Sequence, residues 1–408
     1  MPVILLGTLD TKGAEFQFVR DLLNEAGVAT LAVDAGVLQP PLFPPDIGRD
    51  ALYRAAGTTI EAVVKAADRG QAIAAAARGA AKILNDLHME GQVDGVLSLG
   101  GSAGTTIGTS AMRALPFGVP KIMVSTLASG QVKPYVGVRD IMMLNSVVDI
   151  CGLNRISRTV LANAACAMAG MTRAFRGAAR QGMGAADKPL VTATMFGVTT
   201  PCVEASRKIL EQRGYEVLVF HATGTGGQTM EAFIRDGLIA GVLDITTTEL
   251  ADELVGGVLT AGPERLTAAG LAGVPQVISV GALDMVNFGP PETVPAKFQG
   301  RRFYQHNPTV TLMRTTPDEN DQLGKEIALK ASASKGPTAI LLPLRGVSAI
   351  DAEGKAFWWP EADKALFDSI RLWRSPRVEL VELDLHINDP TFAKAAVEKL
   401  LSIVAKRG

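Results

Sequence analysis

Short runs of aliphatic and β-branched residues alternate along the chain with longer segments whose apolar residues recur every three or four positions. The short runs have the length of buried strands, and the longer segments have the period of helices that cover a sheet. This alternation is typical of an α/β protein with a parallel sheet flanked by helices. The predicted strands are 3–6, 30–34, 95–99, 121–124, 141–145, 190–196, 216–221, 241–246, 275–280, 339–342 and 378–385, and the predicted helices include 15–26, 60–87 and 155–176.

The pattern restarts after the segment RGAARQGMGAADKP, whose glycines and small residues resemble a linker. A boundary near residue 185 gives a first domain at 1–185 and a second α/β domain at 186–408. Two domains suit a chain of 408 residues, because a single hydrophobic core usually stops growing below that size. In the second domain Thr200 is predicted to cap a helix with Pro201 in its first turn, and another helix is predicted from about Thr229.

The turn GGSAGT at 100–105 lies between a predicted strand and a predicted helix. Its small residues leave backbone N–H groups uncovered at the positive end of a helix dipole, which favours an anion such as phosphate. The turn is neither a P-loop nor the dinucleotide fingerprint, because no lysine follows the glycines and the GxGxxG spacing does not fit. The alternative interpretation is a tight strand-to-helix joint in which glycine serves close packing.

Ligands of parallel sheets bind beyond the carboxyl ends of the strands, so polar residues that follow strands are candidates for binding. Hydroxyl groups, glycines and a lysine in these turns predict a cradle for a phosphate ester, and Asp10 or Asp149 could hold Mg²⁺ on its oxygens. The alternatives are a helix cap for Asp10 and Thr11 and simple solvent exposure for Lys12 and Lys133. The predicted nucleotide-binding residues are Thr8, Asp10, Thr11, Lys12, Gly100, Gly101, Ser102, Ala103, Gly104, Thr105, Ser129 and Gly130.

The second half combines histidines near predicted strand ends with carboxylates and arginines in similar positions. These groups suit proton abstraction beside a carbonyl, or metal-assisted lyase or hydrolase chemistry on a small anionic substrate. No metal-ligand spacing is present, and a structural or surface role is the alternative for each residue. Cys202 at a helix start is interpreted as a buried apolar residue, with a reactive thiol as the alternative. The candidate catalytic residues are His221, Glu249, Asp284, His306 and Arg345.

The charges nearly balance, with 40 Lys and Arg against 41 Asp and Glu. This composition provides no basic excess for a nucleic-acid backbone and no polybasic run for a membrane surface. Three cysteines at unrelated spacings suggest a reducing compartment. The chain begins with a strand pattern and has no apolar run long enough to cross a bilayer, so a cytoplasmic location is expected.

Six segments together carry a resemblance to a known family: GTLDTK (7–12), VDAG (33–36), GGSAGT (100–105), SGQVKPYVG (129–137), FGVTTP (196–201) and HATGTGGQ (221–228). Over essentially the whole chain, this set resembles the proteins related to the ATP-binding amino-terminal domain of the tomato mosaic virus resistance protein. The resemblance implies two Rossmann-like domains, an ATP site in the first and homodimers, and it implies no particular catalytic activity. The chain departs from the expected glycine at Ala103, whose methyl group would narrow the approach of a phosphate.

The predicted function is therefore binding of ATP, or of a related phosphorylated small molecule, by the first domain of a cytoplasmic protein. The alternative is a lyase- or hydrolase-type enzyme of small-acid or sugar-acid metabolism, with its site in the second domain. A nucleotide-dependent interaction scaffold is a third reading, for which the proline-rich loops 38–47 and 288–295 are the candidate contact surfaces. The predicted binding of ATP requires that the backbone N–H groups of residues 100–105 face open space.

Overall fold

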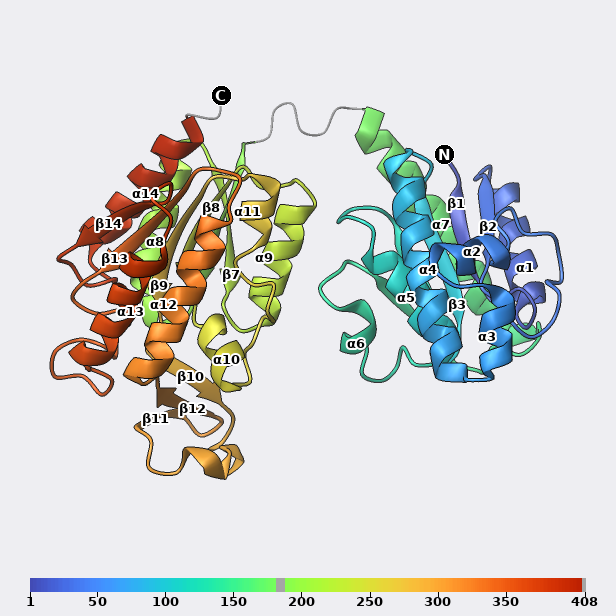
Figure 1. The fold of residues 1–408 in the computed structure, drawn as a ribbon. Coiled ribbons are helices and arrows are strands. Elements are labelled where there is room, and N and C mark those ends of the chain that lie inside the picture. Colours follow the sequence, from blue (N-terminus) through green and yellow to red (C-terminus); the bar gives the residue numbers. More distant parts are fainter. Residues whose placement is uncertain (181–187, 406–408) are drawn as a thin grey trace. The chain divides into compact units, whose positions relative to one another are not determined.

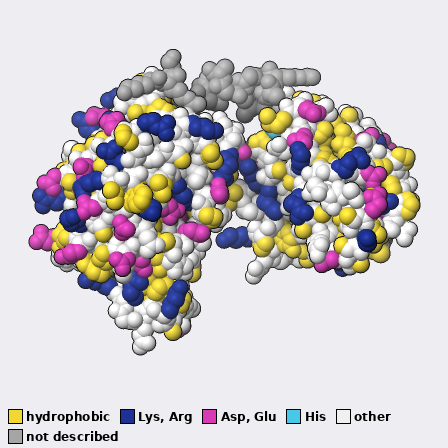
Figure 2. Space-filling model, in the orientation of Figure 1, with side chains coloured by type: hydrophobic (Ala, Val, Ile, Leu, Met, Phe, Trp, Pro, Cys, Tyr) yellow, Lys and Arg dark blue, Asp and Glu magenta, His cyan; other side chains and the backbone are white. Residues whose placement is uncertain are grey.

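The computed structural model describes residues 1–180 and 188–405 and forms two compact units, Met1–Ala186 and Asp187–Gly408. Each unit is built on a parallel sheet with helices on both faces, so the predicted fold class is confirmed (Figure 1). The predicted boundary near residue 185 lies outside the described residues. On the face shown in Figure 2, basic and acidic side chains are interspersed on each unit, as the nearly equal numbers of the two kinds suggest.

The first unit contains a five-stranded parallel sheet in the order β2-β1-β3-β4-β5. This order reverses direction between β1 and β3, and the carboxyl ends of strands at such a switch point are where open α/β sheets bind ligands. The strands are β1 (Val3–Gly7), β2 (Thr30–Asp34), β3 (Gly95–Gly100), β4 (Lys121–Ser125) and β5 (Met142–Asn145). The helices are α1 (Gly13–Glu25), α2 (Arg49–Ala55), α3 (Ile60–Ala66), α4 (Arg69–Met89), α5 (Ser102–Arg113), α6 (Lys133–Val136) and α7 (Arg155–Arg180).

Both faces of this sheet are buried. Alternate residues of β1 point to opposite faces, as the two-residue period of a strand requires. Ile4 and Leu6 join the core under α2, α4 and α5, whereas Val3 and Leu5 join the core under α1 and α7. The strand therefore has apolar residues throughout, which is why the sequence pattern located it.

The predicted helix at 60–87 is two helices, α3 and α4, so that prediction is wrong in its continuity. The chain breaks at Ala67, which has a φ of 50°, and Asp68 caps α4 by accepting the N–H of Gln71 at 3.0 Å. The alanine-rich helical pattern of the sequence continues across Ala67 and Asp68, so the pattern alone does not indicate that a new helix begins there. The break matters because α3 and the start of α4 border the site described below.

The second unit has a six-stranded parallel sheet in the order β14-β13-β9-β8-β6-β7. Helices α8 and α14 cover one face, and α9 to α13 lie over the other. Its strands are β6 (Leu190–Met195), β7 (Glu216–His221), β8 (Gly241–Thr246), β9 (Gln276–Gly281), β13 (Thr338–Pro343) and β14 (Glu379–Leu383). Its α-helices are α8 (Thr200–Gln212), α9 (Thr225–Arg235), α10 (Glu249–Val255), α11 (Ala268–Ala272), α12 (Pro317–Ser332), α13 (Pro360–Trp373) and α14 (Pro390–Val404). Short 3-10 helices lie at Gly197–Thr199, Pro291–Thr293 and Ala296–Phe298.

Two helix starts in this unit differ from their predicted positions. Helix α8 begins at Thr200, so Thr199 and not Thr200 occupies the capping position. Helix α9 begins at Thr225 and not near Thr229, because the glycines form its first turn. A Cβ on Gly226 would lie 1.9 Å from the carbonyl oxygen of His221, so glycine allows this turn to pack on the end of β7.

A small antiparallel sheet was not predicted from the sequence. It consists of β10 (Met285–Phe288), β12 (Val310–Arg314) and β11 (Phe303–Asn307), with β12 in the centre. Every residue of β11 is exposed, so the strand lacks the alternation of apolar and polar residues that marks a half-buried strand. Among the helices of the described residues, none combines the length and the apolar character needed to cross a bilayer.

Candidate functional site

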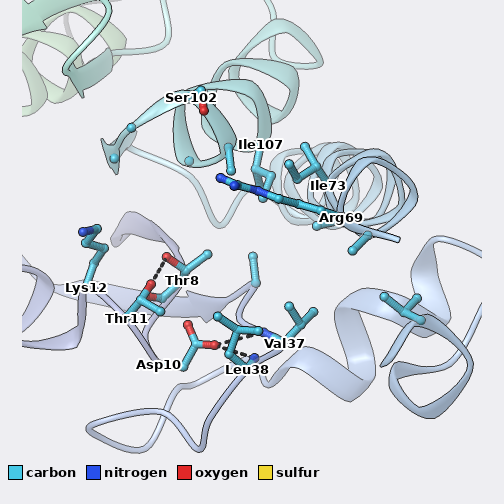
Figure 3. A pocket seen from close by; sticks show the side chains of 18 of the residues that line it. Thr8, Asp10, Thr11, Lys12, Val37, Leu38, Arg69, Ile73, Ser102 and Ile107 are labelled. Atoms are coloured by element: carbon cyan, nitrogen blue, oxygen red, sulfur yellow. Dashed lines mark hydrogen bonds between the residues drawn. The ribbon is translucent and has the colours of Figure 1, made fainter. Parts of the chain in front are cut away.

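A cavity of about 630 Å³ opens in the first unit at the carboxyl ends of β1 and β3 (Figure 3). Its wall includes Thr8 and residues 10–12 after β1, residues 100–104 after β3, and parts of α3, α4 and α5. The volume lies within the range of about 300–1,000 Å³ that is usual for small-molecule sites. The cavity therefore occupies the switch point of the sheet, where the topology favours a ligand.

The glycine-rich turn contributes the start of α5 to this wall. Gly101 occupies the capping position, and among the described residues no side chain caps this helix. The first helical hydrogen bond runs from the N–H of Thr105 to the carbonyl of Gly101 at 2.8 Å, so the N–H groups of residues 102–104 precede it. Ala103 lies in the wall in this first turn, where its methyl group borders the site.

The glycines of the turn have different roles. A Cβ on Gly104 would lie 3.1 Å from the carbonyl oxygen of Leu99, and one on Gly100 would lie 2.9 Å from the Cα of Gly104. These two glycines permit close packing of strand and helix, as the joint interpretation predicts. A Cβ on Gly101 would meet only the Thr126 hydroxyl oxygen, at 3.7 Å, so this position borders open space.

Three predicted binding residues lie outside the described cavity wall. The Thr105 side chain is buried and its hydroxyl contacts that of Ser125 at 2.6 Å, which ties α5 to β4. Ser129 and Gly130 are exposed after β4. Because β4 is one strand beyond β3 in the sheet, its following loop is displaced from the switch point.

Residues 8–12 all come from the turn after β1, and four of them line the cavity as predicted. The hydroxyl groups of Thr8 and Thr11 are 2.9 Å apart, and the Lys12 ammonium group donates to the carbonyl of Ile150. Asp10 Oδ2 accepts backbone N–H groups of the loop after β2, with 2.8 Å to that of Leu38. In the part of the chain that the structure describes, no side chain caps helix α1, so the cap interpretation of Asp10 and Thr11 is wrong, and Asp10 instead anchors the loop.

Magnesium ligation by this wall remains a prediction. Asp10 and Asp149 both line the cavity, and Asp149 Oδ1 accepts the N–H of Ile150 at 2.9 Å. Asp10 Oδ1 is buried and finds no hydrogen-bond partner among residues 1–180 and 188–405. The described residues contain no group of three or more histidines, cysteines or carboxylates placed to hold a metal. Lys133 is exposed on α6, outside the cavity wall, in agreement with its alternative interpretation.

One cationic residue and most of the apolar wall were not predicted from the sequence. Arg69 extends from the first turn of α4 into the cavity, on the side of Ser102 and Ile107 (Figure 3). Val63, Val64 and Ile73 add apolar surface. A cation at a helix start is unusual, since the helix dipole disfavours positive charge there. This position could have indicated Arg69 as a binding residue, but only if the sequence had shown that a new helix begins at Arg69.

The glycine-rich turn of the second unit, between β7 and α9, is filled by a side chain of the protein. Glu249 Oε1 accepts the N–H groups of Gly224 at 2.7 Å and Gly227 at 3.0 Å. A Cβ on Gly227 would lie 2.2 Å from Glu249 Oε2. The anion position at the start of α9 is therefore occupied by a carboxylate of the chain.

Glu249 belongs to a buried ion cluster centred on Arg265. The guanidinium group contacts Glu249 at 2.7 Å, Asp244 at 2.5 Å and Glu231 at 3.4 Å. Burial raises the pKa of Glu249, and the positive charge of Arg265 opposes that rise. These contacts give Glu249 a structural role and leave no free carboxylate oxygen for a substrate.

Asp284 belongs to a second buried cluster, around Arg314. Its Oδ2 accepts the hydroxyl of Ser348 at 2.7 Å, while Arg314 contacts Asp363 at 2.6 Å and Asp351 at 3.5 Å. Burial, followed by the charge of Asp351, raises the pKa of Asp284 to about 8. Two carboxylates therefore contact one guanidinium group inside the unit, and the positive charge of that group lowers the pKa of the nearby Asp284 against the effect of burial.

The other three candidate catalytic residues are exposed, and no described contact joins any two of the five. His221 lies edge-on to Phe196, with ring centroids 5.6 Å apart, and His306 lies on the exposed β11. Arg345 pairs with Asp384, and both side chains are largely exposed. The structure of this unit does not assemble these residues into one site.

Cys202 is buried in α8, and burial raises the pKa of its thiol to about 12. A thiol with such a pKa remains protonated near neutral pH and is a poor nucleophile. The preferred interpretation, a small buried apolar residue, is confirmed.

Fold and site together define a two-domain α/β protein with a small-molecule cavity at the switch point of its first sheet. The chain belongs to the Uncharacterised protein family (UPF0261), whose N-terminal domain matches residues 1–177 and whose C-terminal domain matches residues 188–404. The predicted family resemblance is thereby confirmed.

Its relatives include bacterial and plant proteins. A UPF0261 protein of Clostridium tetani is 51% identical over 99% of both chains. The ToMV resistance protein Tm-1(GCR237) of Solanum lycopersicum is 46% identical over 83% of this chain and 45% of that protein. A UDP-N-acetylglucosamine 2-epimerase structure from Rickettsia bellii aligns over 100% of this chain and 97% of that one at 9% identity, with a TM-score of 0.21, which supports no inference about substrate.

Proposed function

We propose that this protein binds ATP, or a related phosphorylated small molecule, in the cavity of its first unit. The observation that carries the proposal is the uncapped start of α5, whose glycine-rich turn lies in the wall of a cavity of about 630 Å³. Backbone N–H groups at a helix start attract phosphate through hydrogen bonding and through the helix dipole. The position at a sheet switch point supports the same conclusion.

The composition of the wall suits a ligand that has both an anionic and an apolar part. Lys12 and Arg69 supply positive charge to the cavity wall, whereas Val63, Ile73 and Ile107 supply apolar surface. The carboxylates in the same wall already accept backbone N–H groups, as Asp10 and Asp149 show. A nucleoside phosphate combines these two chemical parts in a molecule of suitable size.

The contrast between the two glycine-rich turns also supports a site in the first unit. The turn before α9 is filled by Glu249, while the turn before α5 borders the cavity. We further propose a cytoplasmic location, based on three cysteines at unrelated spacings, and homodimers stay a prediction of the family resemblance. The alternative small-acid enzyme also stays a prediction.

Gly101→Val is expected to weaken the binding of ATP with Mg²⁺ at least about tenfold, a loss of about 1.4 kcal/mol. The added side chain would occupy space beside the N–H groups of the turn. The variant should fold, because a Cβ there contacts only Thr126 and the φ of −79° suits any residue. Isothermal titration calorimetry of the full chain measures the effect.

Gly130→Val provides the matched control. Gly130 is exposed outside the cavity wall, and a Cβ there would lie 3.6 Å from the carbonyl oxygen of Leu127, an ordinary contact. This variant should keep the affinity of the wild type. Equal heats from the wild type and Gly101→Val would refute the proposal, and a loss confined to Gly130→Val would move the site to the loop after β4.

A further inference from the structure

We propose that residues 58–69, here called the α3 arm, close on the ligand in the cavity of the first unit. In this proposal Arg69 pairs with the anionic group at the glycine-rich turn, and Val63 and Val64 cover the apolar part. The inference rests on the proposed function and deepens it, since it assigns the two parts of a nucleoside phosphate to named side chains. The arm comprises Thr58, helix α3 with its capping residues, and the first two positions of α4, namely its capping residue Asp68 and Arg69.

Helix α3 has seven residues, none of them buried. A helix this short is not stable by itself and normally depends on packing of an apolar face. Val63 and Val64 line the cavity, and Val64 is 54% exposed. Val63 already packs against the core under α2, α4 and α5, whereas a ligand in the cavity would give the exposed Val64 an apolar contact that it otherwise lacks.

Two residues with left-handed backbone conformation flank helix α3. Gly57 has a φ of 78°, which glycine adopts readily, and Ala67 has a φ of 50°. For alanine this conformation costs about 1 kcal/mol. Ala67 lies in the cavity wall, and strained backbone concentrates at ligand-binding and switch regions. Asp68 caps α4 independently, so α3 can shift without disrupting α4.

Arg69 is the first residue of α4, where the helix dipole disfavours a positive charge. The first turn of α4 contains no acidic residue, and the capping carboxylate of Asp68 is bonded to the backbone and side-chain amides of Gln71. Within residues 1–180 and 188–405, no hydrogen bond or ion pair of the structure engages the guanidinium group. Figure 3 shows it in the cavity, on the side of the turn that carries Ser102. An anion bound at that turn would supply the missing partner, and guanidinium groups bind phosphate oxygens with high geometric specificity.

The test combines hydrogen exchange with titration calorimetry on the full chain. Saturating ATP with Mg²⁺ should slow exchange of the amides in residues 58–69 several-fold. Arg69→Ala should weaken the binding of ATP and of inorganic tripolyphosphate alike, by at least about tenfold. Val64→Ser should weaken the binding of ATP about fourfold and leave the affinity for tripolyphosphate unchanged, because only ATP has an apolar part.

Arg78→Ala is the matched control, since Arg78 is an exposed residue of the same helix outside the cavity wall. It should bind both probes like the wild type. Wild-type affinity in Arg69→Ala, or unchanged exchange of the arm while calorimetry shows bound ATP, overturns the inference and leaves the proposed function standing. A wild type that gives no heat with either probe overturns both.

Discussion

Arg265→Met is expected to destabilise the second unit by about 3–5 kcal/mol, the range observed when one partner of a buried ion pair is removed. Arg265 is 1% exposed and contacts Asp244, Glu249 and Glu231. Methionine preserves much of the side-chain volume, so the loss reports chiefly on three carboxylates left without their cation. The carboxylates cannot regain water in the folded state, which is why the effect should be large.

Hydrogen exchange of the full chain in increasing urea would measure this loss. Peptides from β8 and β9 report on the second unit, and peptides from β1 and β3 serve as an internal reference for the first unit. Arg345→Met is the control, because Arg345 and its partner Asp384 are both exposed, and it should leave exchange unchanged. A loss below about 1 kcal/mol in Arg265→Met would show that the cluster contributes little to stability.

The stability of the second unit is expected to fall as the pH rises from about 5 to about 8. Burial raises the pKa of Asp284 to about 8 and those of Asp252 and Asp363 to about 7, against 3.8 for an aspartate in water. Between these limits the folded unit binds more protons than the unfolded chain, so a rising pH favours unfolding. Each proton that the folded unit binds and the unfolded chain does not bind changes the free energy of unfolding by about −1.4 kcal/mol per pH unit.

Asp284→Asn tests whether Asp284 causes this pH dependence, because asparagine keeps the shape of the side chain but does not ionise. Urea unfolding at several pH values should give a slope that is shallower by about 1.4 kcal/mol per pH unit between about pH 5 and pH 7. Asp384→Asn should behave like the wild type, since Asp384 is exposed and its pKa is lowered by Arg345. An unchanged slope in Asp284→Asn would exclude Asp284 as the proton-binding group.

The fold could be predicted where burial on both sides of a strand gives a continuous apolar run. All six residues of β3 are buried, as are those of β8, and both strands were located from the sequence. Strand β11 was missed because its residues face solvent and show no period. The break at Ala67 was missed because one capping aspartate, Asp68, is a weak signal within an alanine-rich helical pattern.

The candidate site was predictable only in part. The turns after β1 and β3 were found because glycine and hydroxyl residues follow apolar runs, and these turns meet at the cavity. Strand order is not encoded locally, so the loop with Ser129 and Gly130 was assigned to the same site. The role of Glu249 was also hidden, because the glycines that it contacts precede it by 22 and 25 residues.

The carboxylate that fills the turn before α9 has a thermodynamic consequence. Because Glu249 is part of the chain, its effective concentration at that turn is fixed by the fold and does not depend on any solute. By mass action, a dissolved phosphate compound stabilises only the part of a protein that binds it. The acceptor at the start of helix α9 is therefore built into the chain, and no solute is needed to fill that position.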